Sequence, residues 1–206
     1  MHNIKLSPRL GAIQKQITKK NSVIVDVGCD HCFTSIYALI SHKAKFAFNI
    51  DIRPNPLNTG IENIKKYGLI NQTDNFIADG LKTDKINKKI DYCVISGIGG
   101  NKIANILTNR NKNIKISEYI LLSNDHPEVI RKYIKINNLR IFYEEIIIRD
   151  KYFFHLIKVS NKGLKVINEN DITFGSYNLK HKTKNFISYQ KYLLEKRENI
   201  KLYRNI

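Results

Sequence analysis

The chain has 206 residues, of which 42% are hydrophobic, so it can build one full domain with a small appendage. No window approaches the roughly 18 continuous apolar residues of a membrane-spanning helix, and the first residues lack the apolar centre of a secretory signal. Three cysteines are too few for a disulfide framework, so we expect a soluble cytoplasmic protein that does not associate with membranes.

The formal net charge of +17 favours a polyanionic partner such as nucleic acid. The alternative is that part of this charge follows from a composition rich in Lys, Asn and Ile and is spread over solvated faces. The excess is larger than solubility requires, so nucleic acid is the preferred partner.

Strand and helix signals alternate from residue 22 to residue 139. Continuous apolar runs that end in glycine or an acid are typical of buried parallel strands, and apolar residues at helical spacing separate them. Strands are expected at 22–28, 45–51, 74–80, 90–97 and 117–124. Helices are expected at 34–42, 56–69, 101–110 and 127–139. The alternation predicts an α/β fold with a doubly wound, mostly parallel sheet.

The last third of the chain departs from the alternation of strands and helices. Apolar runs at 140–150 and 151–160 abut with almost no linker and predict an antiparallel hairpin at the far end of the sheet. The sequence after Ser160 is polar and irregular, and a helix is then expected over 185–206. Its apolar residues lie near one face: Phe186, Tyr189, Leu193, Ile200 and Tyr203. The basic residues around them fit either a solvated helix packed on the main domain or an arm that holds RNA.

The first predicted strand runs into a Cys-x-x-Cys pair, Cys29 and Cys32, which surrounds Asp30 and His31. A structural zinc site usually needs four Cys or His ligands, and no second pair exists elsewhere in the sequence. Cys93 stands in an apolar run and is expected to be a buried small hydrophobic residue. The pair is therefore interpreted as part of a turn after a strand, with no metal and no redox role.

Ligands of doubly wound sheets bind beyond the carboxyl ends of the strands, and the first strand end is chemically distinctive. Asp26, Gly28 and Asp30 stand there without the G-x-G-x-x-G pattern of dinucleotide-binding sites. The missing glycines disfavour a nucleotide-dependent oxidoreductase. An acid two residues before a lone glycine suits a cofactor with hydroxyl and cationic groups but no phosphate, such as S-adenosylmethionine (SAM).

Later strand ends fit the same cofactor. Asp51 can accept both hydroxyl groups of a ribose, and Asp79 can accept from an adenine amino group. Gly80, Gly97 and Gly99 let the backbone turn closely or approach a ligand. Strand-end acids often only cap helices, and glycines often only make turns. Four successive strands that each end in such residues are less easily explained by capping and turns alone.

Six short motifs occur in order: "SPRL", "DVGCDH", an acid that ends the second strand, "ADGL", "ISGIGG" and "LLSN". Together they resemble the TrmK family of bacterial tRNA (adenine-N1)-methyltransferases, and the resemblance covers essentially the whole chain. It implies a class I SAM-dependent, Rossmann-like methyltransferase domain at 1–160 and a small helical, coiled-coil-like, tRNA-contacting domain at 161–206. It also implies methylation of the adenine at nucleotide 22 of tRNA, and it does not imply a stable protein partner.

The resemblance extends to individual residues. Positions in the matching motifs are assigned to SAM and its product S-adenosylhomocysteine: Arg9, Asp26, Gly28, Cys29, Asp51, Ile52, Asp79, Gly80, Leu81, Gly97, Ile98 and Gly99. Asp30, His31 and Asn124 are assigned to catalysis at the acceptor base. Where the family tends to have Gln-Pro-Asn, this chain has Leu122, Ser123 and Asn124, so only Asn124 carries over.

The expected reaction needs no strong general base, because adenine N1 already has an in-plane lone pair. It needs alignment of the base with the methyl donor, and a carboxylate such as Asp30 would stabilise the cationic product. Two alternatives stay open on the sequence. One is a SAM-dependent methyltransferase that acts on another RNA or on a protein. The other is a non-catalytic nucleic-acid-binding protein on the same fold.

Overall fold

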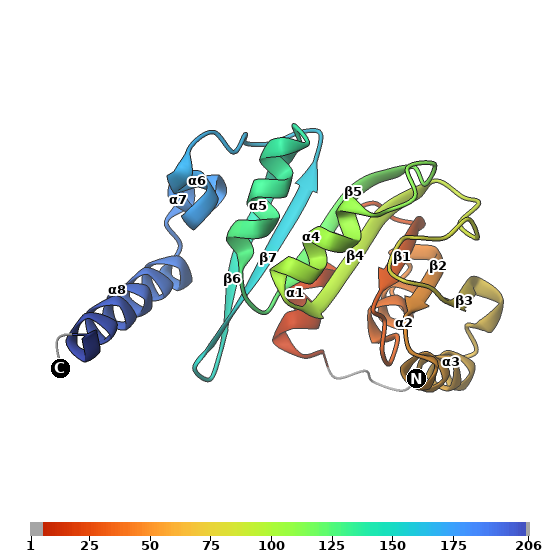
Figure 1. Ribbon diagram of the computed structural model, residues 1–206. Coiled ribbons are helices and arrows are strands. Elements are labelled where there is room, and N and C mark those ends of the chain that lie inside the picture. The colour runs from red at the N-terminus through yellow and green to blue at the C-terminus, as the bar shows by residue number, and fades with distance from the viewer. Residues whose placement is uncertain (1–5, 205–206) are drawn as a thin grey trace.

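The computed structural model describes residues 6–204 and has one seven-stranded sheet at its centre (Figure 1). The strands are β1 (Ser22–Val27), β2 (Ala44–Asp51), β3 (Thr73–Ile77), β4 (Ile90–Ile98), β5 (Ile116–Ser123), β6 (Arg140–Arg149) and β7 (Tyr152–Ser160). Their order in the sheet is β3-β2-β1-β4-β5-β7-β6. The first five strands run parallel, and β7 pairs antiparallel with both β5 and β6. The α/β fold and the terminal hairpin predicted from the sequence are confirmed.

Helices cover both faces of the sheet. One face packs against α1 (Pro8–Gln16), α2 (Phe33–Ile40) and α3 (Pro54–Lys66), through buried residues such as Ile13, Ile36 and Ile64. The other face packs against α4 (Gly100–Thr108) and α5 (Pro127–Ile136), through Ile103 and Ile130. Because β1 is buried on both faces along its whole length, all of its residues except Ser22 and Asp26 are apolar.

Four short elements were not expected from the sequence. Helix α1 begins after Ser7, whose hydroxyl accepts a hydrogen bond from the backbone N–H of Leu10 over 3.2 Å. A 3₁₀ turn, η1 (Ile70–Gln72), precedes β3. The segment predicted as irregular contains α6 (Glu169–Phe174) and α7 (Ser176–His181). Asn168 and Asp171 form a capping box that starts α6.

The last helix, α8 (Lys184–Arg204), leaves the body beside the β6–β7 hairpin and carries the C-terminus outward (Figure 1). Phe186 is 1% exposed, Tyr189 and Leu193 are half-buried, and Lys191, Lys196 and Arg197 are exposed. The predicted apolar face is therefore present where side chains are described. The side chains of Ile200 and Tyr203 lie outside the described residues.

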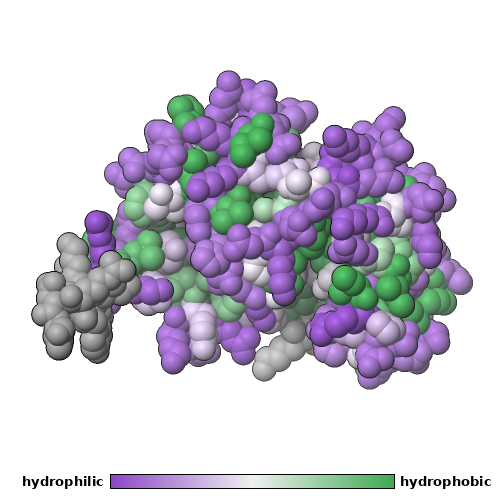
Figure 2. Space-filling view, in the orientation of Figure 1, coloured by the Kyte–Doolittle hydropathy of each residue, from purple (hydrophilic) through white to green (hydrophobic). Residues whose placement is uncertain are grey.

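The surface is mainly hydrophilic on the side seen in Figure 2, with small hydrophobic patches between hydrophilic residues. Among residues 6–204, no helix combines the length and the hydrophobicity that a membrane span requires.

Candidate functional site

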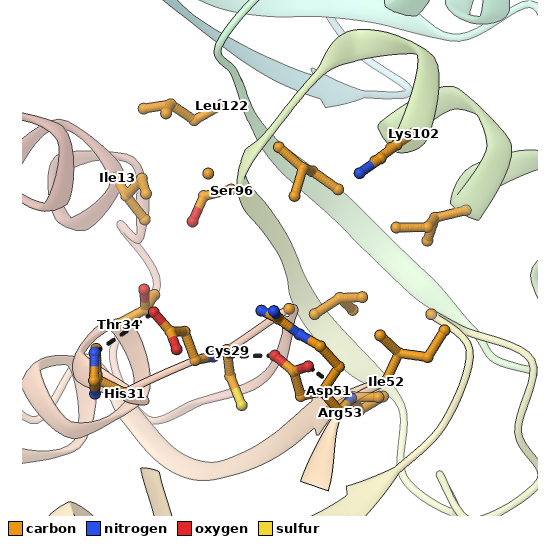
Figure 3. A pocket seen from close by; sticks show the side chains of 18 of the residues that line it. Ile13, Cys29, His31, Thr34, Asp51, Ile52, Arg53, Ser96, Lys102 and Leu122 are labelled. Carbon is orange, nitrogen blue, oxygen red and sulfur yellow. Dashed lines mark hydrogen bonds and ion pairs between the residues drawn. The ribbon is translucent and has the colours of Figure 1, made fainter. Parts of the chain in front are cut away.

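A cavity of about 780 Å³ opens at the carboxyl ends of the parallel strands (Figure 3). Its walls come from the turns after β1, β2, β3 and β4 and from the first residues of α1, including Leu10 and Ile13. Most of the residues assigned to the site from the sequence line it: Arg9, Gly28, Cys29, Asp30, His31, Asp51, Ile52, Asp79, Gly80, Gly97 and Ile98. Asp26, Leu81, Gly99 and Asn124 do not line it.

Asp51 fixes the turns on one side of the cavity. Its carboxylate accepts hydrogen bonds from the backbone N–H of Asp30 over 3.3 Å and from that of Arg53 over 3.0 Å. The backbone N–H groups of Gly28 and Cys29 donate to the carbonyl of Ile50, over 2.8 and 3.1 Å. Gly28 has a φ of +72°, a left-handed conformation that favours glycine. The end of β2 therefore holds the turn after β1 in place.

Asp26 is 2% exposed and lies behind this turn, on the face of β1 that meets α2. Burial raises the pKa of its carboxyl to about 7, and the Asp51 charge adds to the rise, whereas the nearby Thr34 hydroxyl lowers it. Oδ2 of Asp26 makes no hydrogen bond within the described chain. Asp26 is thus a buried acid with one unsatisfied oxygen directly beneath the cavity wall.

The turns after β4 and β5 are joined by hydrogen bonds. Nδ2 of Asn124 donates to the carbonyl of Gly97 over 2.8 Å, and the Asn124 backbone N–H donates to the carbonyl of Ile98 over 3.1 Å. Oδ1 of Asp125 accepts from the backbone N–H of Gly100 over 3.1 Å. A Cβ at Gly99 would lie 2.4 Å from that oxygen, so a side chain there would displace the Asp125 carboxylate from this hydrogen bond. Asn124 therefore shapes a turn that lines the cavity.

Asp30, His31 and Phe33 stand at the mouth of the cavity and are exposed. Nε2 of His31 lies 3.6 Å from Oδ2 of Asp30, and the His31 and Phe33 rings are 6.0 Å apart. Across the cavity, Asp79 pairs with Lys82 over 2.6 Å. Leu81 is fully buried in the core beneath this wall. The mouth thus offers an acid, an imidazole and an aromatic ring on one short segment.

The cysteines of the first turn are free and buried, and so is Cys93. A hydrogen bond to Cys32, followed by burial, raises the pKa of the Cys29 thiol well above its usual range, so Cys29 stays a neutral thiol. Within residues 6–204, no three His, Cys, Asp or Glu side chains gather as metal ligands would. Cys93 is fully buried in the sheet core, as predicted.

Several cavity residues were missed by the sequence interpretation, notably Ser7, Phe33, Arg53, Lys102 and Asn105. Arg53 follows the assigned residues Asp51 and Ile52 directly, and Phe33 follows the "DVGCDH" motif closely, so a wider window around each motif would have found them. Lys102 and Asn105 lie in α4 at helical spacing, where nothing in the sequence shows which face looks into the cavity.

Known proteins resemble this chain along most of its length. A family model described as TrmK, tRNA (adenine(22)-N(1))-methyltransferase, matches residues 24–204. The tRNA (adenine(22)-N(1))-methyltransferase of Bacillus subtilis (strain 168) is 30% identical over 151 residues, which are 73% of this chain and 63% of that protein. The match thus spans less than two thirds of the curated relative.

Two further matches agree. A putative tRNA methyltransferase, MG248, of Mycoplasma genitalium is 28% identical over 161 residues, which are 76% of this chain and 70% of that protein. The structure of M. capricolum TrmK with the cofactor product S-adenosyl-homocysteine is 33% identical and has a TM-score of 0.85. That match covers 95% of this chain and 86% of the other. Because the family model matches nearly the whole described chain, the chain belongs to the TrmK family.

Proposed function

We propose that this chain transfers a methyl group from S-adenosylmethionine to N1 of adenine 22 in tRNA, giving 1-methyladenosine. The observation that carries the proposal is the cavity at the strand ends of a TrmK-family chain, with Asp51 and Asp79 in its walls. The relatives named for this reaction, and the relative whose structure holds S-adenosyl-homocysteine, support it.

The described residues fit S-adenosylmethionine, which when bound supplies an electrophilic methyl group on a sulfonium. A carboxylate has about four lone-pair positions, so Asp51 can accept ribose hydroxyls beside its two backbone donors. Ile52, Ala78 and Ile98 give an apolar wall suited to the adenine ring. The unsatisfied oxygen of Asp26 provides negative charge behind the turn that would face the cationic methionine end.

The acceptor base would enter at the mouth beside Asp30 and His31. Phe33 is 38% exposed and is the sole Phe or Tyr side chain among the described residues that line the cavity. A base taken out of a tRNA helix loses its stacking partners, and an aromatic ring replaces them. Phe33 is therefore the residue on which we place the flipped adenine.

The chain has little proton chemistry to perform, because adenine N1 carries no proton at neutral pH. Its task is to hold N1 in line with the methyl group at near-attack distance. The product carries a positive charge on the ring, so the Asp30 carboxylate would stabilise the charge that develops in the transition state. His31 would hold the edge of the base, and Asn124 would act through the turn at Gly97.

The tRNA would be held across both parts of the chain, with residues 161–206 as the tRNA-contacting part. The net charge of +17 and the exposed Lys191, Lys196 and Arg197 on α8 support this arrangement. A tRNA substrate also supports a cytoplasmic location for the protein.

The test is methyl transfer from labelled S-adenosylmethionine to unmodified tRNA, with the product digested to nucleosides. We expect 1-methyladenosine, which disappears when the adenine at nucleotide 22 is replaced by another base. Cofactor binding without methyl transfer to tRNA would overturn the assignment of the acceptor, and so would 1-methyladenosine that survives the base change.

A further inference from the structure

Among the described residues, three Arg or Lys side chains line the cavity, and two of them make no side-chain hydrogen bond or ion pair within that part of the chain. The Arg9 guanidinium lies 4.7 Å from the centre of the Phe154 ring, which fixes it against the sheet. Arg53 and Lys102 are exposed, and their side chains make no hydrogen bond or ion pair with any described residue. Two free cations at one cavity need an explanation.

Arg53 and Lys102 stand on opposite sides of the cavity mouth. Arg53 begins α3 after β2, and Lys102 lies in the first turns of α4 after β4, while β1 runs between those two strands. Figure 3 shows the Arg53 side chain directed across the front of Asp51 and the Lys102 ammonium directed into the same space from the α4 wall. The two charges therefore flank the opening through which a base would enter.

The cofactor of the proposed function does not account for these charges. S-adenosylmethionine brings a sulfonium and an ammonium but only one carboxylate, so two extra cations beside it are unfavourable. The acids of the cavity contact groups other than the side chains of Arg53 and Lys102. Asp79 pairs with Lys82 over 2.6 Å, Asp51 accepts from two backbone N–H groups, and Asp30 lies 3.6 Å from the His31 ring. The anion that Arg53 and Lys102 suit must come from outside the chain.

We infer that Arg53 and Lys102 form a phosphate clamp, which holds the RNA backbone on both sides of the nucleotide that enters the cavity. The inference rests on the proposed function, since it takes tRNA as the polyanion. Arg53 can bind a phosphate through two parallel N–H groups, and Lys102 through its ammonium. Phosphate contacts of this kind fix position without reading sequence, which is what a flipped nucleotide needs.

The test compares the full-length protein with Arg53→Ala, Lys102→Ala and the double variant. Binding of unmodified tRNA is measured with S-adenosylhomocysteine present, from about 50 to about 200 mM salt. Since binding is measured without methyl transfer, its result does not depend on the reaction. The matched control is Lys66→Ala with Lys115→Ala, two exposed lysines. Lys66 is the last residue of α3, and Lys115 directly precedes β5, so each lies at the end of its element that faces away from the cavity.

We expect the double variant to bind tRNA about tenfold more weakly at the upper salt, with a salt slope smaller by about 1.4 to 1.8. Affinity for S-adenosylhomocysteine should stay within about twofold, and Arg53→Lys with Lys102→Arg should restore the slope. Three results would each overturn the clamp. They are an equal loss of tRNA affinity in the control pair, an unchanged salt slope in the double variant, and a loss of affinity for S-adenosylhomocysteine instead of tRNA. A wild-type chain that binds tRNA in this way but forms no 1-methyladenosine would refute the proposed function and leave the clamp standing.

Discussion

Nε of Arg131 donates to Oε1 of Glu144 over 2.8 Å, and both side chains are 1% exposed. Nη1 of Arg131 also donates to the carbonyls of Ile172 and Thr173 at the end of α6, and Oε2 of Glu144 accepts from the backbone N–H of Tyr177 in α7. The pair thus supplies hydrogen-bond partners to backbone groups at the end of α6 and the start of α7. It joins α6 and α7 to α5 and β6.

Glu144→Ala should destabilise the protein by about 3 to 5 kcal/mol, because it leaves the Arg131 charge buried without a partner. Urea unfolding measures the change. Glu62→Ala is the control, because Glu62 pairs with Lys65 at the surface and should cost less than about 1 kcal/mol. Similar losses of unfolding free energy in the two variants would show that the buried pair stabilises the protein no more than a surface pair does.

Asp26→Asn should flatten the dependence of stability on pH. The folded pKa of Asp26, about 7, lies above the value of 3.8 for a free carboxyl, so the folded state binds more protons between those values. Stability from this group is full below about pH 4 and falls by about 1.4 kcal/mol per unit as pH rises toward 7. The variant should therefore gain stability over wild type near neutral pH, without cofactor, while binding S-adenosylmethionine more weakly.

The measurement is urea unfolding of the cofactor-free protein across that pH range. Asp74→Asn, at an exposed position of β3, is the matched control and should leave the profile unchanged. A profile for Asp26→Asn that is parallel to wild type would mean that Asp26 ionises normally in the folded chain.

His155→Phe should raise stability relative to wild type at acidic pH, whereas Asp26→Asn should raise it near neutral pH. Burial, with the Arg131 charge adding, lowers the pKa of His155 to about 3, so the unfolded chain binds more protons between about pH 6.5 and pH 3. Stability from this group is full above pH 6.5 and is lost on acidification, by about 1.4 kcal/mol per unit. A phenyl ring can keep the contact with Tyr189, whose ring centre lies 4.7 Å away, and removes the titration.

Acid unfolding of His155→Phe should therefore have its midpoint at a lower pH than wild type. His42→Gln, at an exposed position, should leave the midpoint in place. An unchanged midpoint in His155→Phe would show that acid unfolding is governed by other groups.

The sequence predicts the sheet well because its inner parallel strands, such as β1 and β4, are buried along most of their length. β1 reads Ser-Val-Ile-Val-Asp-Val, and all six residues are buried, so apolar character alone locates it. Helix α1 was missed because its inward face includes Gln14 and Gln16. Nε2 of Gln14 donates to the carbonyl of Thr34 over 2.8 Å, and the carbonyl of Gln16 accepts from the buried Lys158. Polar residues that meet partners far along the chain look solvated in a sequence.

Contacts between residues far apart in the chain also limit prediction of the site. Glycines and acids at strand ends mark the cavity because the topology brings every parallel strand end to one edge. Arg131 and Glu144 look like ordinary surface charges until α6 and α7 cover them. Asn124 has an expected place, but its hydrogen bond to the Gly97 carbonyl depends on two turns that are 27 residues apart.

Asn124→Ala distinguishes two roles for that residue. If it shapes the turn at Gly97, its loss should weaken S-adenosylmethionine binding several-fold as well as slow methyl transfer. If it contacts the acceptor base alone, cofactor affinity should stay unchanged while kcat/KM for tRNA falls. Calorimetry with the cofactor, beside a methyl-transfer assay, separates the two roles. We expect the first result, because the Asn124 amide is already used by Gly97.

Removal of residues 191–206 should weaken tRNA binding and spare the rest of the protein. A deletion from residue 161 would be a poor test, because Val166, Ile172 and Phe186 are buried in the body and Arg131 would lose its partners. The shorter deletion keeps Phe186 and Tyr189 in place and removes five basic and two acidic residues. Cofactor affinity and the urea midpoint should change little, while KM for tRNA should rise several-fold with a smaller salt slope.

The full-length variant Lys191→Ala with Lys196→Ala and Arg197→Ala should reproduce part of that rise if charge is the cause. An unchanged KM in the deletion would exclude the end of α8 from tRNA binding.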